Sequence, residues 1–239
     1  MDKRQEKILH AVIHEYIRHG DPIGSRLLYE EYDFDVSPAL IRAELHELME
    51  AGYLSQPHTS GGRVPTDKGY RDYVEAVSGD IAEMDGMPDS MKRFEALCRG
   101  AIGESFKEMI SLMSHAANAL GVGYEFDPVA VYKQGFNALF EQIEGASHED
   151  LARIVDDFEN LDARVDKIAA ALDPAEESAQ VYIGKQSPVT KSDQLAVLMR
   201  GYQLPDGRRV AISIVGPKRM NYRRNLTLLK LVSLIMQDM

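Results

Sequence analysis

The sequence predicts an α+β fold in two parts: helices with one short β-hairpin, then a mostly helical part with a small sheet. Three observations predict this. Apolar residues recur at helical spacing in four segments before residue 77. A stretch rich in glycine and proline separates the third segment from the fourth. Two strand-like runs flank a Pro-Asp-Gly turn at residues 205–207.

The composition is that of a soluble globular protein. Of its 239 residues, 44% are hydrophobic and 27% are charged. No apolar run approaches the ~18–20 residues of a membrane span, and the N-terminus lacks the apolar run of a signal peptide. Cys98 is the only cysteine, so an internal disulfide is excluded and a reducing cytoplasm is the expected location.

The charge balance constrains any interaction with nucleic acid. The net charge is −11, which taken alone argues against such a partner. The first 77 residues are also acidic, with nine Lys or Arg against fourteen Asp or Glu. A DNA-binding interpretation must therefore depend on where those nine cations lie.

The first three helices are predicted by their caps and apolar faces. Asp2 is expected to cap a helix that Gly20 ends, and Ser25 to cap a short second helix. Ser37 and Pro38 suit the N-cap and first turn of a third helix, where the N–H that proline lacks is not needed. The buried stripe of this third helix is expected to contain Leu40, Ile41, Leu45, Leu48 and Met49, with Gly52 at its end.

The segment that follows predicts a hairpin and a fourth helix. Tyr53-Leu54 and Arg63-Val64 are expected as short strands on either side of "TSGG", and Pro65 tolerates only the edge or end of a strand. Thr66 is expected to cap the fourth helix. Three helices, a hairpin and a helix in residues 1–77 are typical of a winged helix-turn-helix domain.

The remainder predicts a linker at residues 78–90 and a second domain at residues 91–239. Helices are expected at 91–120, 129–143 and 148–172, with "GVGYEFDP" interrupting the first two. A short strand is expected at 181–183, a hairpin at 195–204 and 208–215, and a final helix at 221–236.

The candidate DNA contacts follow from how a helix-turn-helix presents its second helix to the major groove. The outward residues of the third helix are Ser37, Pro38, Ala39, Arg42 and His46. Arg42 is the best base reader, because a guanidinium pairs bidentately with guanine, worth ~1–3 kcal/mol of discrimination. Phosphate contacts are expected from Ser25 and Arg26. The hairpin offers groove or backbone contacts from His58, Thr59, Ser60 and Arg63, with Lys68 behind them.

Other groups of residues give weaker evidence of a function. His10 and His14 have a metal-compatible spacing but no third ligand nearby, so neither a metal nor a cofactor is expected. No catalytic constellation emerges, so the chain is not expected to be an enzyme. The densest basic run, Lys218, Arg219, Arg223 and Arg224, either meets an acidic partner or the DNA backbone, or pairs with carboxylates of the chain itself.

Four segments resemble the HrcA family of bacterial heat-inducible transcription repressors. They are "QEKILHAVIHEYIRHGDPIGSRLL", "VSPALIRAELHELMEAGYLSQPHTSGGRVPTDKGYRDYV", "VYIGKQ" and "IVGPKRMNYRRNLTLL". The hairpin segment, residues 56–74, matches almost continuously, and the "GPxRMxY" pattern at 216–222 is an independent match. The "VYKQGFNALFEQIE" segment is more weakly similar to the stretch preceding that pattern.

The resemblance implies a dimeric repressor that binds double-stranded DNA at an inverted-repeat operator, the CIRCE element, upstream of chaperone operons. It implies a winged helix followed by a GAF-like domain with an inserted dimerising domain, and a chaperonin partner that keeps the repressor active. Family members are longer than this chain. The missing part is expected between about Leu120 and Val129, which would reduce the GAF-like sheet to three strands and remove the usual dimer contact.

Two further expectations follow. Leu40 and Ala43 stand where the family usually carries Thr and Asn, so the operator is expected to have drifted from the standard sequence. A homodimer is expected through the helices of the second domain, whose apolar residues mostly form an internal core and otherwise a helix–helix seam. The rival functions are a protein-interaction module and a small-molecule-sensing regulator.

Overall fold

The computed structural model describes residues 1–57, 61–79, 88–102, 105–143, 147–172, 178–204 and 206–238. The chain divides into two compact units, Met1–Gly79 and Asp80–Met239. His58, Thr59 and Ser60 of the expected hairpin lie outside the described residues, as does most of the expected linker at 78–90.

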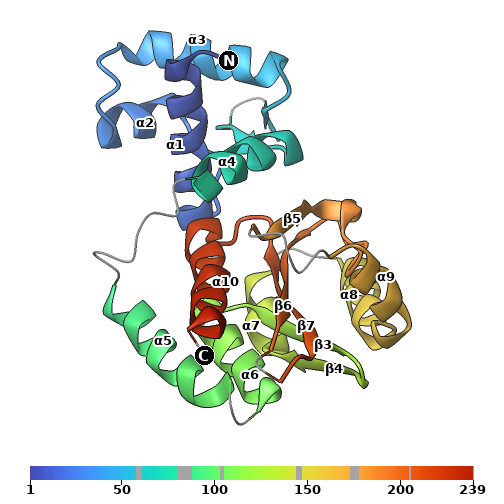
Figure 1. The fold of residues 1–239 in the computed structure, drawn as a ribbon. Helices are drawn as coiled ribbons and strands as arrows, with labels where there is room; N and C mark the ends of the chain where they lie inside the picture. Colours follow the sequence, from blue (N-terminus) through green and yellow to red (C-terminus); the bar gives the residue numbers. More distant parts are fainter. Residues whose placement is uncertain are drawn as a thin grey trace. The chain divides into compact units, whose positions relative to one another are not determined.

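The first unit contains the predicted order of helices and strands (Figure 1). The helices are α1 (Lys3–His19), α2 (Ser25–Glu31), α3 (Pro38–Glu50) and α4 (Asp67–Gly79), and the strands are β1 (Leu54–Ser55) and β2 (Val64–Pro65). The two strands are antiparallel, with Leu54 opposite Pro65. Buried apolar residues from every helix and from β1 form its core: Ile8, Leu9, Val12, Ile13, Leu28, Ile41, Leu45, Leu48, Leu54, Tyr70, Val74 and Val77.

Most of the expected helix caps are confirmed. The Asp2 carboxylate accepts the N–H groups of Arg4 and Gln5, and Gly20 ends α1 at a φ of 76°. The prediction for Ser25 was wrong: Gly24 occupies the extended N-cap position of α2, and Ser25 is the first helical residue. Glycine is well tolerated at an N-cap because its backbone adopts the extended conformation without requiring a side-chain acceptor.

The second unit is built on a five-stranded antiparallel sheet in the order β4-β3-β7-β6-β5. The strands are β3 (Leu120–Phe126), β4 (Val129–Gln134), β5 (Gln180–Ile183), β6 (Leu195–Gln203) and β7 (Arg209–Pro217). The helices are α5 (Asp89–Ile102), α6 (Phe106–Ala117), α7 (Phe136–Gln142), α8 (His148–Glu159), α9 (Val165–Ala170) and α10 (Tyr222–Gln237), with 3-10 turns η1 (Asp162–Arg164) and η2 (Gly184–Gln186). No helix within the described ranges is both long and apolar enough to cross a membrane.

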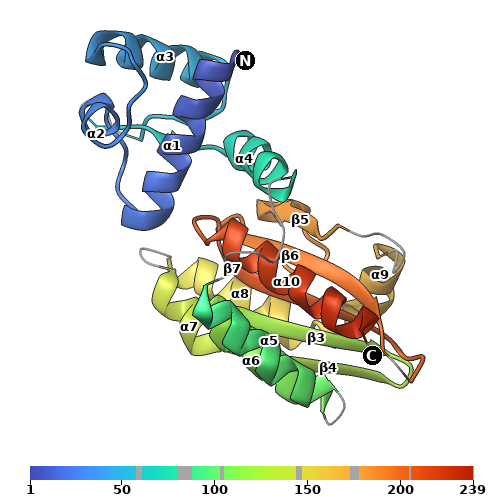
Figure 2. The ribbon, with the colours of Figure 1, turned by 60° about the vertical axis from the view of Figure 1, so that its left-hand side comes forward.

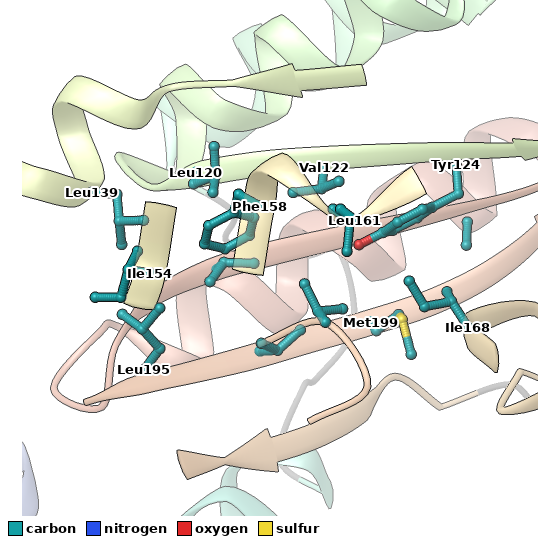
Figure 3. Packing of buried hydrophobic residues seen from close by; sticks show 14 of the residues in the cluster. Leu120, Val122, Tyr124, Leu139, Ile154, Phe158, Leu161, Ile168, Leu195 and Met199 are labelled. Carbon is teal, nitrogen blue, oxygen red and sulfur yellow. The ribbon is translucent and has the colours of Figure 1, made fainter. Parts of the chain in front are cut away.

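Helices cover both faces of this sheet. α5, α6 and α10 lie on one face, while α7, α8 and α9 lie on the other (Figure 2). The core beneath α7–α9 joins apolar residues of β3 and β6 to those of the helices, with Tyr124 and Phe158 among its largest members (Figure 3). These helices' apolar residues are expected mostly in an internal core and otherwise in a dimer seam. The following are buried or half-buried: Phe106, Ile110, Met113, Leu120, Phe136, Leu139, Phe140, Leu151, Ile154, Phe158, Leu161, Val165 and Ile168.

The predicted boundaries of the three long helices in this unit were wrong. Residues 91–120 hold two helices, because Ser105 caps α6 by accepting the N–H of Glu108 at 3.4 Å. Residues 129–143 hold β4 and then α7, joined at Gly135 with a φ of 95°. Residues 148–172 are divided at Asn160, where α8 ends before η1 and α9.

Most of the expected interruption "GVGYEFDP", residues 121–126, belongs to β3, an interior strand of the sheet, and the described residues form five strands in this sheet rather than three. Its glycines serve close packing instead of a turn. A Cβ on Gly123 would lie 2.5 Å from the side chain of Ile110 on α6, and a Cβ on Gly121 would lie 3.0 Å from the Ile110 carbonyl. Glycine in a strand thus marks the place where a neighbouring helix approaches the sheet.

Candidate nucleic-acid interface

The third helix of the first unit is the element to which the candidate contacts belong. Ser37 accepts the N–H of Leu40 at 3.3 Å, and Pro38 occupies the first turn, so α3 begins where its cap predicts. Ile41, Leu45 and Leu48 are buried, and α3 packs through them against α1 and α2. The remaining side of α3 faces solvent.

A buried carboxylate fixes α3 against the start of α1. The Glu44 side chain is 5% exposed, and its Oε1 accepts Nε and Nη2 of Arg4, each at 2.8 Å. Gln5 adds a second link, donating to Glu47 Oε2 at 2.7 Å. Two donors of one guanidinium converge on a single carboxylate oxygen, and these charge-assisted bonds restrain the rotation of α3 about its own axis. The outward face of the helix is determined by that rotation.

A second buried carboxylate, Glu15 on α1, holds the end of α2. It accepts the Tyr32 hydroxyl at 2.7 Å and also contacts Arg18 at 3.2 Å and His19 Nε2 at 3.1 Å. Burial alone would raise the pKa of Glu15, but the hydrogen bonds from Tyr32 and His14 and the charge of Arg18 lower it below its ordinary value. The connection between α2 and α3 is therefore tied to α1 through an ionised carboxylate.

The solvent face of α3 carries four residues at helical spacing. Ala39, Arg42, Ala43 and His46 follow each other at intervals of three or one and are all exposed. Neither Arg42 nor His46 has a hydrogen bond or ion pair with any residue that the structure describes. The exposure expected for Ser37, Pro38 and Ala39 is also observed.

Leu40 differs from its expected place in the buried stripe. Its side chain is 38% exposed, because the stripe of α3 turns through Ile41 and Glu44 and leaves Leu40 at its edge. Leu40 and Ala43 are thus surface residues in the first two turns of α3, with Leu40 on the flank of the exposed side away from Arg42. Their exposure is the feature of this site that the apolar pattern of the sequence did not reveal.

The start of α2 carries one exposed cation, Arg26. Arg26 is 90% exposed and forms an ion pair with Glu30 one turn later, at 2.7 Å. Ser25 is half-buried in the first turn. Four exposed carboxylates follow closely, at Glu30, Glu31, Asp33 and Asp35, so the connection to α3 is acidic.

The β1–β2 hairpin is held to the α1–α2 connection by its backbone. Arg63 and Ile23 exchange two backbone hydrogen bonds, at 2.9 and 2.7 Å. A Cβ on Gly62 would lie 2.5 Å from backbone atoms of Pro22 and Ile23, so only glycine fits this approach. The Arg63 side chain is half-buried, and its guanidinium donates to the Gly61 carbonyl at 3.4 Å.

Lys68 has an internal role that the sequence did not suggest. Its ammonium donates to the Ala51 carbonyl at 2.8 Å, at the end of α3, and lies 4.0 Å from the centroid of the Tyr53 ring. Of the expected histidine pair, His10 contacts Asp72 on α4 at 3.4 Å, and His14 is 2.8 Å from the Tyr32 hydroxyl. The structure thus directs these two histidines to different partners.

Comparison with known proteins decides the family. Residues 89–226, more than half of the chain, match the family model described as "HrcA protein C terminal domain". The chain belongs to the HrcA family. The heat-inducible transcription repressor HrcA of Caldanaerobacter subterraneus subsp. tengcongensis is 39% identical over 116 residues, which are 48% of this chain and 34% of that protein. The protein of the same name from Moorella thermoacetica is 53% identical over 77 residues, 32% of this chain and 22% of that protein.

The chain therefore matches about a third or less of the length of these two HrcA relatives. A solved structure described as "Crystal structure of a hypothetical protein at 2.2 A resolution" resembles it with a TM-score of 0.74, over 100% of this chain and 97% of that one. The identity of that pair is 17%, so the likeness concerns the fold alone.

The basic run Lys218, Arg219, Arg223 and Arg224 lies within the HrcA match, where β7 is followed by α10. Lys218 lies 3.3 Å from Asp193, and Arg219 donates to the Gln142 carbonyl at the end of α7, also at 3.3 Å. Tyr222 is fully buried, and its hydroxyl donates to the Lys218 carbonyl at 2.6 Å. For these residues of the "GPxRMxY" pattern, the structure favours an intramolecular role. Arg224 is exposed.

Proposed function

We propose that this chain is a non-enzymatic DNA-binding transcription repressor of heat-shock genes. In this proposal residues 1–79 form a winged helix-turn-helix domain with α3 as recognition helix and the β1–β2 hairpin as wing, and the second unit is GAF-like. One observation carries it: α3 exposes Arg42 and His46 without internal partners, in a chain of the HrcA family.

The proposed chemistry assigns each element one task. Arg42 pairs bidentately with a guanine in the major groove, worth ~1–3 kcal/mol of discrimination. Ser25 and Arg26 contact phosphates. Arg26 gives up its exposed ion pair with Glu30 and binds a phosphate oxygen instead, which costs little because solvent screens that pair. Arg63 and the wing residues His58, Thr59 and Ser60 contact the adjacent backbone or groove. Lys68 contributes least, because it is already bound to Ala51 and Tyr53.

The operator is proposed to be an inverted repeat bound by a homodimer. A two-fold symmetric site is matched by two copies of one reading helix, with half-sites one helical turn or a multiple apart. The second unit is the proposed place of association. The seam is expected on surface residues of this unit, because most apolar residues of its helices are buried or half-buried within it.

Capture of genomic fragments tests this function. The purified full-length chain is incubated with sheared genomic DNA of its organism at low salt, and bound fragments are sequenced and footprinted. The expected result is a small set of fragments carrying an inverted repeat upstream of chaperone operons. Retention of no fragment at any salt concentration would contradict the proposal.

A protein-interaction module is the second candidate, and a specific observation favours it. Leu40 and Ala43 are exposed on α3. Four exposed carboxylates at the end of α2 and in the connection to α3 repel phosphates. Under this alternative the capture experiment returns no DNA, while α3 still forms the contact surface. The two candidates are thus separated by the same experiment.

A further inference from the structure

We propose that Leu40 and Ala43 make α3 a reader of thymine methyl groups in the same half-site as the base that Arg42 contacts. This inference rests on the proposed DNA-binding function and adds the base class to it. It assigns specificity to two residues that carry no hydrogen-bonding group. Together with Ala39 they form an apolar patch on the exposed side of the first two turns of α3.

The position of this patch carries the argument. Leu40 is the third residue of α3, and its backbone N–H is bound to the capping Ser37 hydroxyl, so it lies in the turn that a helix-turn-helix presents to base edges. Ala43 is one turn further on, at i+3 from Leu40 and i+4 from Ala39. Arg42 is exposed within the same two turns. Leu40 and Arg42 lie on the two flanks of the exposed side, with Ala39 and Ala43 between them. A base of the same half-site as the one read by Arg42 therefore meets this patch.

The chemistry of the major groove determines which base fits. Adenine, cytosine and guanine present polar edges there, whereas thymine adds a C5-methyl group that apolar side chains contact. When the polar edge of a base is placed against Leu40, it loses its hydrogen bonds to water and gains none from the protein, which is unfavourable. A thymine methyl placed there is removed from water instead. The patch therefore selects thymine by a favourable apolar contact and by rejecting the other bases.

Exposure of a single leucine is ordinary on a protein surface, and the matched control is Leu97. Leu97 on α5 is 49% exposed, more than Leu40 at 38%. It has no place in the proposed reading helix. A substitution of Leu97 thus controls for the loss of an exposed leucine as such.

The test removes the methyl group and nothing else. The full-length chain selects its preferred duplex from a randomised library, and each thymine of the selected half-site is then replaced singly by deoxyuridine. Fluorescence anisotropy measures the dissociation constant of each duplex. We expect replacement of at least one thymine in the half-site that holds the Arg42-dependent guanine to weaken binding about fourfold, the factor that corresponds to burial of one methyl group.

Variants link this effect to the patch. Leu40→Ser is expected to bind thymine and deoxyuridine duplexes equally at that position, whereas Leu97→Ser keeps the fourfold difference. If the wild type binds its selected DNA but no deoxyuridine replacement changes affinity by more than about twofold, the inference is overturned while the proposed function stands. An equal thymine preference in Leu40→Ser also overturns it. A chain that selects no sequence overturns both.

Discussion

Replacing Gly62 with alanine should release the hairpin from the α1–α2 connection. The added Cβ would lie 2.5 Å from Pro22 C, Pro22 O and Ile23 C. All three are backbone atoms, so no change of rotamer relieves the contact. Carbon atoms pack at about 3.5–4.0 Å, so the two segments must separate by about 1 Å. The Ile23–Arg63 hydrogen bonds, now 2.9 and 2.7 Å, would then exceed ordinary bonding distance.

The loss of stability in Gly62→Ala is the sum of three contributions. Two lost backbone hydrogen bonds cost about 0.5–1.5 kcal/mol each, and overpacking costs about 1–3 kcal/mol. Alanine also restricts the unfolded chain, which offsets about 0.4–1 kcal/mol. We therefore expect the opening free energy of the first unit to fall by about 1–6 kcal/mol, a large part of the ~5–15 kcal/mol typical of a domain.

Hydrogen exchange followed by mass spectrometry on the full-length chain measures this change in the first unit alone. Protection of the α1 and hairpin amides is compared with that of Gly79→Ala, because a Cβ on Gly79 meets nothing within 4 Å. Gly79→Ala should differ from the wild type by less than about 0.5 kcal/mol. Equal protection in Gly62→Ala and Gly79→Ala would refute the close approach on which this reasoning depends.

Three further outcomes follow from buried groups. The lowered pKa of Glu15 implies stability that is present above its ordinary value of 4.5 and lost as the pH falls through the native pKa. Glu15→Gln, which keeps a partner for Tyr32, should therefore lose about 1–3 kcal/mol at pH 7 and show a flatter acid unfolding curve; an unchanged curve would contradict this. Asp157 is buried and accepts Arg164 at 2.8 Å, so Asp157→Ala should destabilise the second unit by about 3–5 kcal/mol in urea unfolding, and a loss below about 1 kcal/mol would contradict the pairing. Burial raises the pKa of the Cys98 thiol to about 12, so a thiol reagent at pH 8 should react at least about 100-fold faster in denaturant than in buffer, and equal rates would show that Cys98 is accessible.

Local signals were sufficient to predict the first unit. Asp2 and Ser37 satisfy backbone N–H groups within three residues, and Gly52 ends α3 at a φ of 77°, so the information lies in adjacent positions. Thr66 likewise accepts the Gly69 N–H at 3.2 Å at the start of α4. These interactions are independent of the rest of the fold. The order of elements could therefore be predicted from sequence.

The sheet of the second unit could not be predicted in full, because its glycines have tertiary causes. Gly121 and Gly123 resemble a turn in sequence, but the space for a Cβ is filled by Ile110 of α6. Val129 and Val131 are two residues apart in β4, and α7 begins only two residues after β4 ends. The apolar residues of the two elements together therefore resemble one helical pattern in the sequence. Contacts between distant segments decided these elements.

The sequence predicted the exposure of Arg42 and His46 in the candidate site, but not the exposure of Leu40 or the internal bond of Lys68. Arg42 and His46 lie opposite the stripe of α3, so periodicity alone predicts their exposure. Leu40 lies next to Ile41 at the border of that stripe, where exposure depends on how α1 and α2 pack. The bond between Lys68 and the Ala51 carbonyl joins residues seventeen apart and has no sequence signature. Tertiary contacts thus decided which cations are available to DNA.

The most direct measurement of the central claim is the affinity of Arg42→Ala for a captured operator fragment, by fluorescence anisotropy over a range of salt concentrations. The matched control is Arg93→Ala, which removes the same charge from an exposed position on α5. The account predicts that Arg42→Ala binds about 5- to 150-fold more weakly and loses its preference for guanine at one position, while Arg93→Ala binds as the wild type does. Equal affinity and equal base preference in both variants would contradict the assignment of α3 as the element that reads DNA.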